Sequence, residues 1–579
     1  MSRNAEIAAI LEEFADLLDA QRVEYKPRSY RRAADNVREH PEPIEELASE
    51  GTDAVGRIEG VGDAISSKIV EYVETGSIEE LEALREELPV AMEELTAVEG
   101  VGPKTVGDLY EALGVTTLDE LEEAARNEEI REVKGYGPKT EENILSNVEF
   151  AREARERALL GQARPVADGV LARLEREDAV ERCAVAGSIR RWRPTVGDVD
   201  VLAASEDPEA VVEALTGWGR VERVMQAGTM KASVRAAGVQ VDLRVVAPDE
   251  YGAALQYFTG SKDHNVRVRN RALAQDLKVN EYGVFDTSGV DDPDAGQRVG
   301  ERLASETEET VYDAIGMAWM PPELREDRGE VDAAAEGTLP DLVETIDVRG
   351  ELHTHTNWSD GDLSIEGLID AAARFGHEYL AITDHATGPG MVGGVGVEDD
   401  ELREQAEVIR DAAADAPIEV FTGVEANIDA DGNVSVADDV LADLDLVVAS
   451  PHSGLDGDGT DRLVRAIEHP EIDVLGHPSG RMLNSRSGME IDPRRLGEAA
   501  AENDVALEVN ANPHRLDLWG SAVKAAVEAG AIIAVNTDAH RPSEFDYLRY
   551  GVHTARRGWA EAGDVLNTRD VAGVRAFLE

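Results

Sequence analysis

The 579-residue sequence contains very little cysteine or lysine and few aromatic residues. Its one cysteine, Cys183, excludes an intrachain disulfide and fits a reducing cytoplasm. Aromatic residues make up 4% of the chain, and nine of the 57 basic residues are lysine. No run of about 18 apolar residues occurs, which excludes a transmembrane helix. The acidic amphipathic start lacks the pattern of a secretory signal. We therefore expect a cytoplasmic protein without a membrane partner.

Acidic residues dominate the charge. The chain has 119 Asp and Glu against 57 Lys and Arg, a net charge of −62. These acids are spread among periodic apolar residues, so we expect several folded domains with acidic surfaces and not a disordered tail. An acid-rich, lysine-poor chain resembles proteins of salt-accumulating halophiles, where a Debye length of roughly 3 Å at 1 M salt screens self-repulsion. Without such screening, this charge would argue against a nucleic-acid partner.

Three short N-terminal segments resemble one another: IEGVGDAISSKI (58–69), VEGVGPKTVGDL (98–109) and VKGYGPKTEENI (133–144). In each, an apolar residue precedes a Gly-x-Gly turn and a helical pattern. Glycines permit a tight turn, and the free N–H groups of the next helix can bind a phosphate. The pattern resembles the helix-hairpin-helix motif, which grips the DNA backbone without reading bases. The alternative is ordinary packing of helical hairpins. The predicted DNA-binding glycines are Gly60, Gly62, Gly100, Gly102, Gly135 and Gly137.

Carboxylates gather in two later segments. Asp198 and Asp200 enter the apolar run VDVLAA, and Asp242 lies opposite the apolar face of GVQVDLRVVAP. If these strands pair, three carboxylates converge in an oxygen-rich site suited to Mg²⁺. Two such ions about 3.5–4 Å apart can align an attacking hydroxyl with a leaving phosphate. Upstream, the run GSIRR offers a turn and, in Arg190 and Arg191, two cations for phosphate oxygens.

Two further motifs follow, YFTGSKDHNVRVRNRA (257–272) and PPELRE (321–326). Together with GSIRR, GDVDV and VDLRV, they make residues 1 to about 328 resemble family X DNA polymerases, the group of DNA polymerase beta. The resemblance implies gap-filling synthesis by a small N-terminal domain, fingers, an α+β nucleotidyltransferase palm and a thumb. It implies metal binding and catalysis by Asp198, Asp200 and Asp242. It also implies nucleotide contacts through Gly187, Ser188, Arg191, Tyr257, Phe258, Asn265 and Arg269.

The resemblance also places Lys68 where the family's lyase lysine forms a Schiff base with an abasic sugar, with Tyr30 and Lys26 at supporting positions. That chemistry requires a lowered lysine pKa. The alternative, which we favour, is that Lys68 only binds a phosphate.

After an acidic, weakly patterned segment, the hydrophobic pattern of the sequence changes. Short apolar runs alternate with helical stretches, which predicts seven parallel strands in a β/α arrangement. The runs are 346–352, 379–383, 418–424, 446–450, 472–476, 505–509 and 531–535. Six of the seven are followed by a residue able to bind a metal ion: His353, His355, Asp360, His385, Glu425, His452, His477, Asp538 and His540.

Six of the 12 histidines fall at these strand ends. Barrel enzymes place their chemistry there, and scattered surface histidines would not. Nine nitrogen and oxygen ligands can hold two or three Mn²⁺ or Zn²⁺ ions. Residues 347–579 therefore resemble the PHP (polymerase and histidinol phosphatase) domain, which implies 3′–5′ exonuclease, 3′-phosphatase or abasic-site endonuclease activity. Arg481, Asn510 and Asn512 are near enough to strand ends to touch substrate, or to serve only in loops.

We thus predict a multidomain fold: a helix-hairpin-helix domain (1–90), fingers (91–155), palm (156–255), thumb (256–328), linker (329–346) and a (β/α)7 PHP barrel (347–579). The chain is identified as a family X polymerase of haloarchaeal type. Expected partners are gapped or nicked DNA and dNTPs, and we expect a monomer. We attribute DNA binding at this net charge to backbone N–H groups and to local arginines: Arg190, Arg191, Arg193, Arg267, Arg269 and Arg271.

Three alternatives stay open. In one, the polymerase carries a purely structural barrel. In another, the chain is a DNA end-binding module with a degenerate polymerase site. In the third, it is a DNA-tethered phosphatase acting on small phosphoesters.

Overall fold

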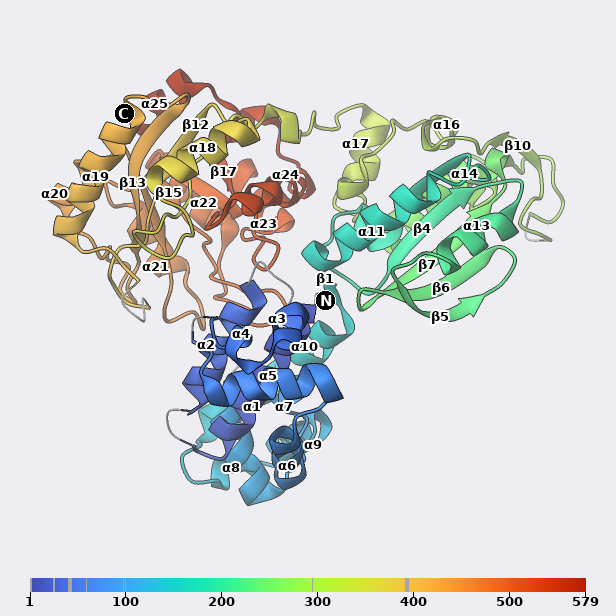
Figure 1. Cartoon of the computed structure of the whole chain (residues 1–579). Helices are drawn as coiled ribbons and strands as arrows, with labels where there is room; N and C mark the ends of the chain where they lie inside the picture. Colours follow the sequence, from blue (N-terminus) through green and yellow to red (C-terminus); the bar gives the residue numbers. More distant parts are fainter. Residues whose placement is uncertain are drawn as a thin grey trace. The chain divides into compact units, whose positions relative to one another are not determined.

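The computed structural model in Figure 1 describes residues 3–23, 26–39, 44–58, 60–96, 98, 100–293, 295–390 and 395–579. The chain forms two compact units. The first comprises residues 1–157 with 484–486, and the second comprises 158–483 with 487–579. Among the described residues, no helix combines the length and apolar character needed to cross a membrane.

In the first unit, the regular elements of the described residues are helices. Their apolar faces share one core, in which Phe14 stacks on Tyr30 with ring centroids 4.5 Å apart. The amphipathic start of the sequence forms the first of them, as predicted. The helices are α1 Arg3–Ala20, α2 Lys26–Glu39, α3 Ile44–Glu50, α4 Thr52–Val55, α5 Asp63–Thr75, α6 Glu79–Glu87, α7 Met92–Thr96, α8 Pro103–Leu113, α9 Leu118–Arg126, the 3-10 turn η1 Ile130–Glu132, and α10 Pro138–Glu156.

The second unit opens with a five-stranded sheet, the predicted palm, in the order β2-β4-β7-β6-β5. Strands β4 and β7 are parallel and the other pairs are antiparallel. Helices α11 and α13 contribute to the core on one face, and α14 packs on the other. The elements are β1 Ala158–Leu159, α11 Leu160–Leu174, β2 Arg182–Val185, α12 Gly187–Arg190, β3 Thr195–Val196, β4 Val199–Ala204, α13 Pro208–Thr216, β5 Val221–Ala227, β6 Lys231–Ala236, β7 Val239–Val246, η2 Pro248–Glu250 and α14 Tyr251–Thr259.

A smaller layer follows, in which helices pack on the sheet β10-β9-β8. Its elements are α15 Lys262–Leu273, β8 Leu277–Asn280, β9 Gly283–Asp286, β10 Glu301–Ala304, α16 Glu308–Asp313, η3 Pro322–Leu324 and α17 Glu330–Glu336. Helix α17 lies inside the predicted linker. It is ordered because the buried carboxylate of Glu330 accepts a hydrogen bond from His264 Nδ1 at 2.7 Å, and His264 Nε2 lies 3.0 Å from Tyr312 Oη.

The C-terminal region contains all seven predicted strands, parallel and in sequence order. A parallel bridge between Thr354 and Ala539 nearly closes them into a barrel, which confirms the predicted fold. The first strand is shorter than predicted, because the 3-10 turn η4 Thr345–Asp347 takes up the start of 346–352. The strands are β11 Gly350–Glu351, β12 Tyr379–Ile382, β13 Glu419–Asn427, β14 Leu446–Ser450, β15 Val474–Leu475, β16 Ala506–Asn510 and β17 Ile532–Asn536.

Helices surround this barrel (Figure 1). They are α18 Ile365–Phe375, α19 Asp399–Ala413, α20 Asp438–Leu441, α21 Thr460–Ile467, α22 Pro493–Glu502, α23 Gly520–Glu528, α24 Leu548–Arg557 and α25 Val571–Leu578, with the 3-10 turns η5 Pro542–Tyr547, η6 Ala562–Asp564 and η7 Leu566–Thr568. The barrel packs directly on the palm. Leu516 and Tyr550 enter the palm core, and Trp192 stacks on His553 with ring centroids 3.6 Å apart.

Candidate functional site

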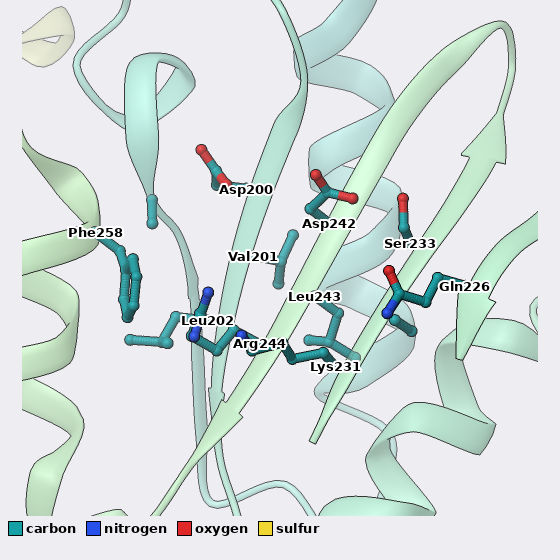
Figure 2. A pocket seen from close by; sticks show the side chains of 12 residues that line it. Asp200, Val201, Leu202, Gln226, Lys231, Ser233, Asp242, Leu243, Arg244 and Phe258 are labelled. Carbon is teal, nitrogen blue, oxygen red and sulfur yellow. The ribbon is translucent and has the colours of Figure 1, made fainter. Parts of the chain in front are cut away.

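The two carboxylate segments of the palm meet as predicted. Asp200 on β4 is the register partner of Asp242 on β7, and Asp198 directly precedes β4. Figure 2 shows the carboxylates of Asp200 and Asp242 side by side at one end of a cavity of about 230 Å³. Gly187 is closely packed here, because a side chain at this position would collide with the Asp200 carboxylate. Its φ of +57° also suits glycine.

The clustered carboxylates repel one another. Burial, followed by the charges of Asp198 and Asp242, raises the pKa of Asp200 to about 7. Asp242 is steadied by Gln240, whose Nε2 donates to its two oxygens at 3.0 and 3.2 Å. A divalent cation would relieve the repulsion, and the oxygen-only set fits Mg²⁺. The sequence analysis missed Gln240, although its spacing of two residues from Asp242 along a strand places both on one face.

The rest of the cavity supplies positive charge and an aromatic ring. Lys231 and Arg244 lie at the end away from the carboxylates, and Phe258 lines the side (Figure 2). The Arg244 guanidinium lies 4.2 Å from the centroid of the Phe258 ring. Of the predicted nucleotide contacts, Gly187 and Phe258 are therefore at the carboxylate site.

Three other predicted nucleotide contacts, Tyr257, Asn265 and Arg269, form one hydrogen-bonded group. Asn265 Nδ2 donates to the Tyr257 carbonyl at 2.8 Å, and Arg269 Nε donates to the Asn265 carbonyl at 3.3 Å. Gln256 Nε2 donates to Asn265 Oδ1 at 2.9 Å and fixes the amide. Ser188 lies on the short helix α12, next to Gly187.

Three of the arginines predicted to meet phosphates form ion pairs with glutamates. Arg190 binds both oxygens of Glu308 at 2.7 Å, and burial of this pair ties α12 to α16. Arg191 and Arg193 share Glu326, at 3.1 and 3.4 Å. The prediction of Arg190 as a phosphate contact is therefore corrected: its guanidinium is held by the buried Glu308, which also pairs with Arg325, and by the Thr259 hydroxyl.

Arg267 is similarly engaged, with Asp332 at 2.7 Å. Arg269 is exposed and bonded only to a carbonyl among the described residues, so it keeps an uncompensated charge.

In the barrel, the nine predicted metal-binding residues gather at the C-terminal ends of the strands. They fall into three overlapping groups whose candidate ligand atoms lie within 4.8 Å of one another: His355, Asp360, His385 and His540; His353, His355 and Glu425; and His385, Glu425 and His452. Asp538 joins them, with Oδ1 3.1 Å from His355 Nε2. His477 joins through Glu425, 3.0 Å from its Nε2.

Glu425 is the centre of this arrangement. Because β13 continues to Asn427, its fully buried carboxylate lies inside the strand and not after it. Its Oε2 lies 2.5 Å from His385 Nδ1 and 3.5 Å from His353 Nε2, and its Oε1 lies 3.3 Å from His452 Nε2. One carboxylate among five histidines would be a central ligand of any metal ions that this set holds.

The donor atoms fit metal ions. Among the described residues, Nε2 of His353, His355 and His452 and Oε2 of Glu425 are buried without a hydrogen-bond partner. Buried polar atoms are almost always satisfied, so such a concentration of unpartnered nitrogen and oxygen atoms fits a set of metal ligands. The mixed histidine and carboxylate set suits Mn²⁺ or Zn²⁺.

The ionisation of the cluster is uneven. Burial lowers the pKa values of His353, His385 and His540, but neighbouring carboxylates outweigh burial and raise all three, so metal binding would displace their protons. Burial lowers the pKa of His355 to about 3, and the neighbouring His540 and His385 add to the effect, so the imidazole is neutral as a ligand must be. Burial raises the pKa of Glu425, but the surrounding histidines outweigh it and hold that pKa well below the usual range. Likewise, His540 and the other histidines overcome burial and lower the pKa of Asp360 to about 2.

Groups that the sequence analysis missed hold the predicted ligands in place. Glu508 Oε1 lies 2.7 Å from His353 Nδ1, and its Oε2 accepts from the His477 backbone N–H at 2.6 Å. Asn427 Oδ1 lies 2.7 Å from His452 Nδ1. These second partners fix the ring orientation of a metal ligand. Only the position of Glu508 and Asn427 within barrel strands could have pointed to them.

The sequence left open whether three residues touch substrate or only shape loops, namely Arg481, Asn510 and Asn512, and the structure gives them different contacts. Asn510 Nδ2 donates to Asp538 Oδ2 at 3.0 Å, so it orients a candidate ligand. Asn512 accepts from the His514 N–H and shapes the loop. Arg481 donates to the Arg515 carbonyl at 2.9 Å, away from the ligand atoms, whereas Arg515 itself lies 3.8 Å from Asp538 Oδ2. Arg515 is thus the cation nearest to this candidate centre among the described ion pairs.

The three N-terminal repeats form the same turn. The N–H of Val61, Val101 and Tyr136 each donates to the carbonyl three residues earlier, at 3.1, 2.9 and 3.1 Å. Gly60, Gly100 and Gly135 have φ of +74°, +85° and +105°, a region that favours glycine. Gly62 and Gly102 are the N-caps of α5 and α8, and Gly137 precedes α10.

These turns differ in how closely a ligand could approach their backbone. Nothing lies within 4 Å of a Cβ built on Gly62, Gly100, Gly102, Gly135 or Gly137, so a phosphate could approach the backbone closely. A Cβ built on Gly60 would instead lie 3.0 Å from Asn36 Nδ2 and 3.2 Å from Arg32 Cγ.

Lys68 is poorly suited to act as a nucleophile. Its Nζ lies 2.8 Å from Glu80 and 5.6 Å from the centroid of the Phe14 ring. Burial lowers its pKa, but Glu80 and Tyr30 outweigh burial and the pKa is raised. Lys26 is exposed at the start of α2. The geometry favours a charged, phosphate-binding lysine over a Schiff-base lysine.

Comparison with known proteins accounts for both halves of the chain. It is 34% identical, over 96% of its length and 95% of the relative's, to DNA polymerase/3′-5′ exonuclease PolX of Bacillus subtilis (strain 168). The chain belongs to the family X DNA polymerases of the PolX type. Rat DNA polymerase lambda is 24% identical over 56% of each chain. A probable phosphatase of Caldanaerobacter subterraneus subsp. tengcongensis is 32% identical over 33% of this chain and 75% of its own.

Four family matches agree with this membership in the PolX type. Residues 2–78 match the Helix-hairpin-helix domain and 92–148 the SAM-like Helix-hairpin-helix tandem. Residues 254–326 match the DNA polymerase beta thumb, and 351–512 match the PHP domain. The resemblance drawn from sequence motifs is thereby confirmed. The chain is an enzyme of this family, with a nucleotidyltransferase part and a PHP phosphoesterase domain.

Proposed function

We propose that this protein fills short gaps in DNA by template-directed nucleotidyl transfer and processes 3′ ends in its barrel. The observation that carries the proposal is the presence, in one chain, of two separate sets of converging metal-binding groups. One is the carboxylate set of the palm, and the other is the histidine-rich set of the barrel. Gapped or nicked DNA and dNTPs are the proposed substrates, and the enzyme is proposed to act as a cytoplasmic monomer.

In the palm, Asp198, Asp200 and Asp242 would hold Mg²⁺, which polarises the triphosphate and the attacking hydroxyl. Asp242, fixed by Gln240, is placed to assist the primer 3′-hydroxyl. Gly187, which has no side chain, leaves room for the Asp200 carboxylate and would contact the nucleotide through its backbone. The other proposed nucleotide contacts are Ser188, Arg191, Tyr257, Phe258, Asn265 and Arg269.

In the barrel, nine residues would hold two or three Mn²⁺ or Zn²⁺ ions, which supply activated water and stabilise a phosphoryl transition state. Glu425 would bridge ions, and Glu508 and Asn510 would orient ligands. Arg515 is placed to bind a phosphate oxygen of the scissile strand. We propose 3′–5′ exonuclease as the main activity, with 3′-phosphatase or abasic-site cleavage as further reactions of the same site.

The three alternatives are not favoured. A degenerate polymerase site would lack one of its aspartates, and all three are present. A structural barrel would lack ligands, and none of the nine is missing. A phosphatase for small phosphoesters would not need the intact palm motifs.

One experiment tests the proposal. A labelled primer on gapped DNA is incubated with Mn²⁺ in molar KCl, with and without dNTPs. Wild type is compared with Asp198→Ala/Asp200→Ala and with His353→Ala/His355→Ala. We expect extension to vanish only in the first variant and shortening only in the second. Shortening by the histidine variant would refute the proposed role of the barrel.

A further inference from the structure

A second, unexplained cavity lies at the junction of the palm and the barrel. Its volume is about 170 Å³, and its wall combines residues far apart in the sequence. Four arginines line it, Arg193, Arg328, Arg481 and Arg557, and none of its lining residues is acidic. In a chain of net charge −62, such a concentration of positive charge is unexpected on composition alone.

The nearby carboxylates do not neutralise these arginines. Glu326 is shared between Arg557, at 3.2 Å, and the two palm arginines Arg191 and Arg193. The Arg328 side chain makes no hydrogen bond or ion pair with the described residues. Among the described groups, the three lining arginines Arg193, Arg328 and Arg557 therefore face one carboxylate, which Arg191 also shares.

Arg481 faces one further acid, the fully buried Asp517. One oxygen of that carboxylate already accepts from the Ser479 N–H at 3.0 Å and the Ser479 hydroxyl at 2.9 Å. The four lining arginines thus face two carboxylates, one of them shared with Arg191, and net positive charge remains at the cavity.

The electrostatics of Arg557 reflect this excess. Burial lowers its pKa, Glu326 opposes the effect, and the charges of Arg193 and Arg328 lower it further, to about 10. A bound anion would offset the repulsion between Arg557 and the charges of Arg193 and Arg328.

The cavity is also preorganised for an anion. The Arg481 guanidinium is fixed by the carbonyls of Arg515 and Leu516 and lies 5.2 Å from the centroid of the Trp519 ring. The nine-residue helix α23 begins at this wall. The N–H groups of Ala522 and Val523 donate to the Trp519 carbonyl, which leaves those of Gly520 and Ser521 for an anion. The exposed Ser521 adds a hydroxyl donor in the first turn.

We propose that this cavity binds a phosphate group and is a third ligand site, separate from both catalytic centres. It contains none of the residues proposed to hold metal ions, so the proposal stands whether or not either catalytic activity is found. The phosphate comes either from a DNA strand at the junction or from a free phosphate such as pyrophosphate. Because both domains supply arginines, its binding strengthens the contact between palm and barrel.

The test is calorimetric titration of the full-length protein with pyrophosphate in EDTA, which removes metal-dependent binding at the two catalytic centres. Wild type is compared with Arg328→Gln, Arg193→Gln/Arg328→Gln, and the control Arg374→Gln on α18, whose side chain is exposed. We expect Arg328→Gln to weaken binding about tenfold, the double variant to weaken it further, and the control to match wild type. Folding is checked by circular dichroism.

A second arm identifies the source of the phosphate. Single-stranded oligonucleotides with and without a 5′-phosphate are titrated under the same conditions, with pyrophosphate as competitor. Mutual displacement that is weakened by Arg328→Gln supports the site with DNA as its ligand. Binding of pyrophosphate alone, with the same dependence on Arg328, supports the site with a free phosphate. Equal affinity of wild type and both arginine variants, or no saturable binding, overturns the proposal.

Discussion

Asp200 is the direct cross-strand partner of Asp242, because β4 and β7 run parallel and in register. Burial, followed by the charges of Asp198 and Asp242, raises the pKa of Asp200 from 3.8 to about 7. The folded state therefore holds this proton more tightly than the unfolded state does. Its contribution to stability is greatest below pH 4 and is lost as the pH rises to about 7.

Asp200→Asn should therefore stabilise the metal-free protein while abolishing extension. We expect the free energy of unfolding in EDTA at pH 8 to increase by about 1–3 kcal/mol. At pH 4 the gain should nearly disappear. Denaturant unfolding at both pH values measures this, with the exposed Asp178→Asn as the matched control. A stability loss at pH 8 would contradict the proposed repulsion.

Removing metal should destabilise the barrel, because buried ligands are left unsatisfied. Restoring Mn²⁺ or Zn²⁺ at 100 times its dissociation constant should add about 2.7 kcal/mol of stability. Calorimetric melting before and after dialysis against EDTA measures the difference. The variant His353→Ala/His355→Ala should respond much less. Equal responses of the two proteins would place the metal elsewhere.

Glu508→Gln should weaken metal binding without removing a ligand. Glu508 holds the His353 ring and the His477 backbone, and losing such a partner typically costs 10- to 100-fold in metal affinity. Competition with a fluorescent chelator measures the affinity, and Glu498→Gln on the exposed face of α22 is the control. We expect shortening of the primer to fall in parallel while extension is retained. Unchanged affinity would show that Glu508 has no orienting role.

Lys68 should trap abasic DNA poorly near pH 7, because Glu80 and Tyr30 raise its pKa and keep it protonated. Glu80→Gln removes the ion pair and should increase the yield of borohydride-trapped product at pH 8, whereas Lys68→Arg should eliminate it. Efficient trapping by wild type at pH 7, unchanged by Glu80→Gln, would instead establish a lyase lysine.

Gly102→Ala should weaken DNA binding without disturbing the fold. The residue has ordinary φ, and nothing lies within 4 Å of an added Cβ, so the methyl group would meet only an approaching phosphate. We expect about a fivefold loss of affinity, the effect of one hydrogen bond. Fluorescence anisotropy at several KCl concentrations measures it, with Gly219→Ala, equally open, as control. A salt slope typical of many phosphate contacts would refute binding mainly through backbone N–H groups.

Spacing along the chain was enough to predict both catalytic regions. Asp198 and Asp200 share a face of a strand, and the barrel histidines follow strand after strand, because alternation and strand ends are local properties. The glycine turns of the repeats are equally local. Consequently, the family, the seven-stranded barrel and the candidate metal ligands could be predicted from the sequence.

Tertiary structure alone decided which charges remain available. Arg190 and Lys68 had the residue types for phosphate and Schiff-base chemistry, but Glu308 and Glu80 reach them from distant segments. The same holds for Glu508, and for the four arginines that meet between palm and barrel. Pairing of charges depends on distance in space, which local sequence patterns do not encode, whereas strand periodicity and turn chemistry are encoded locally.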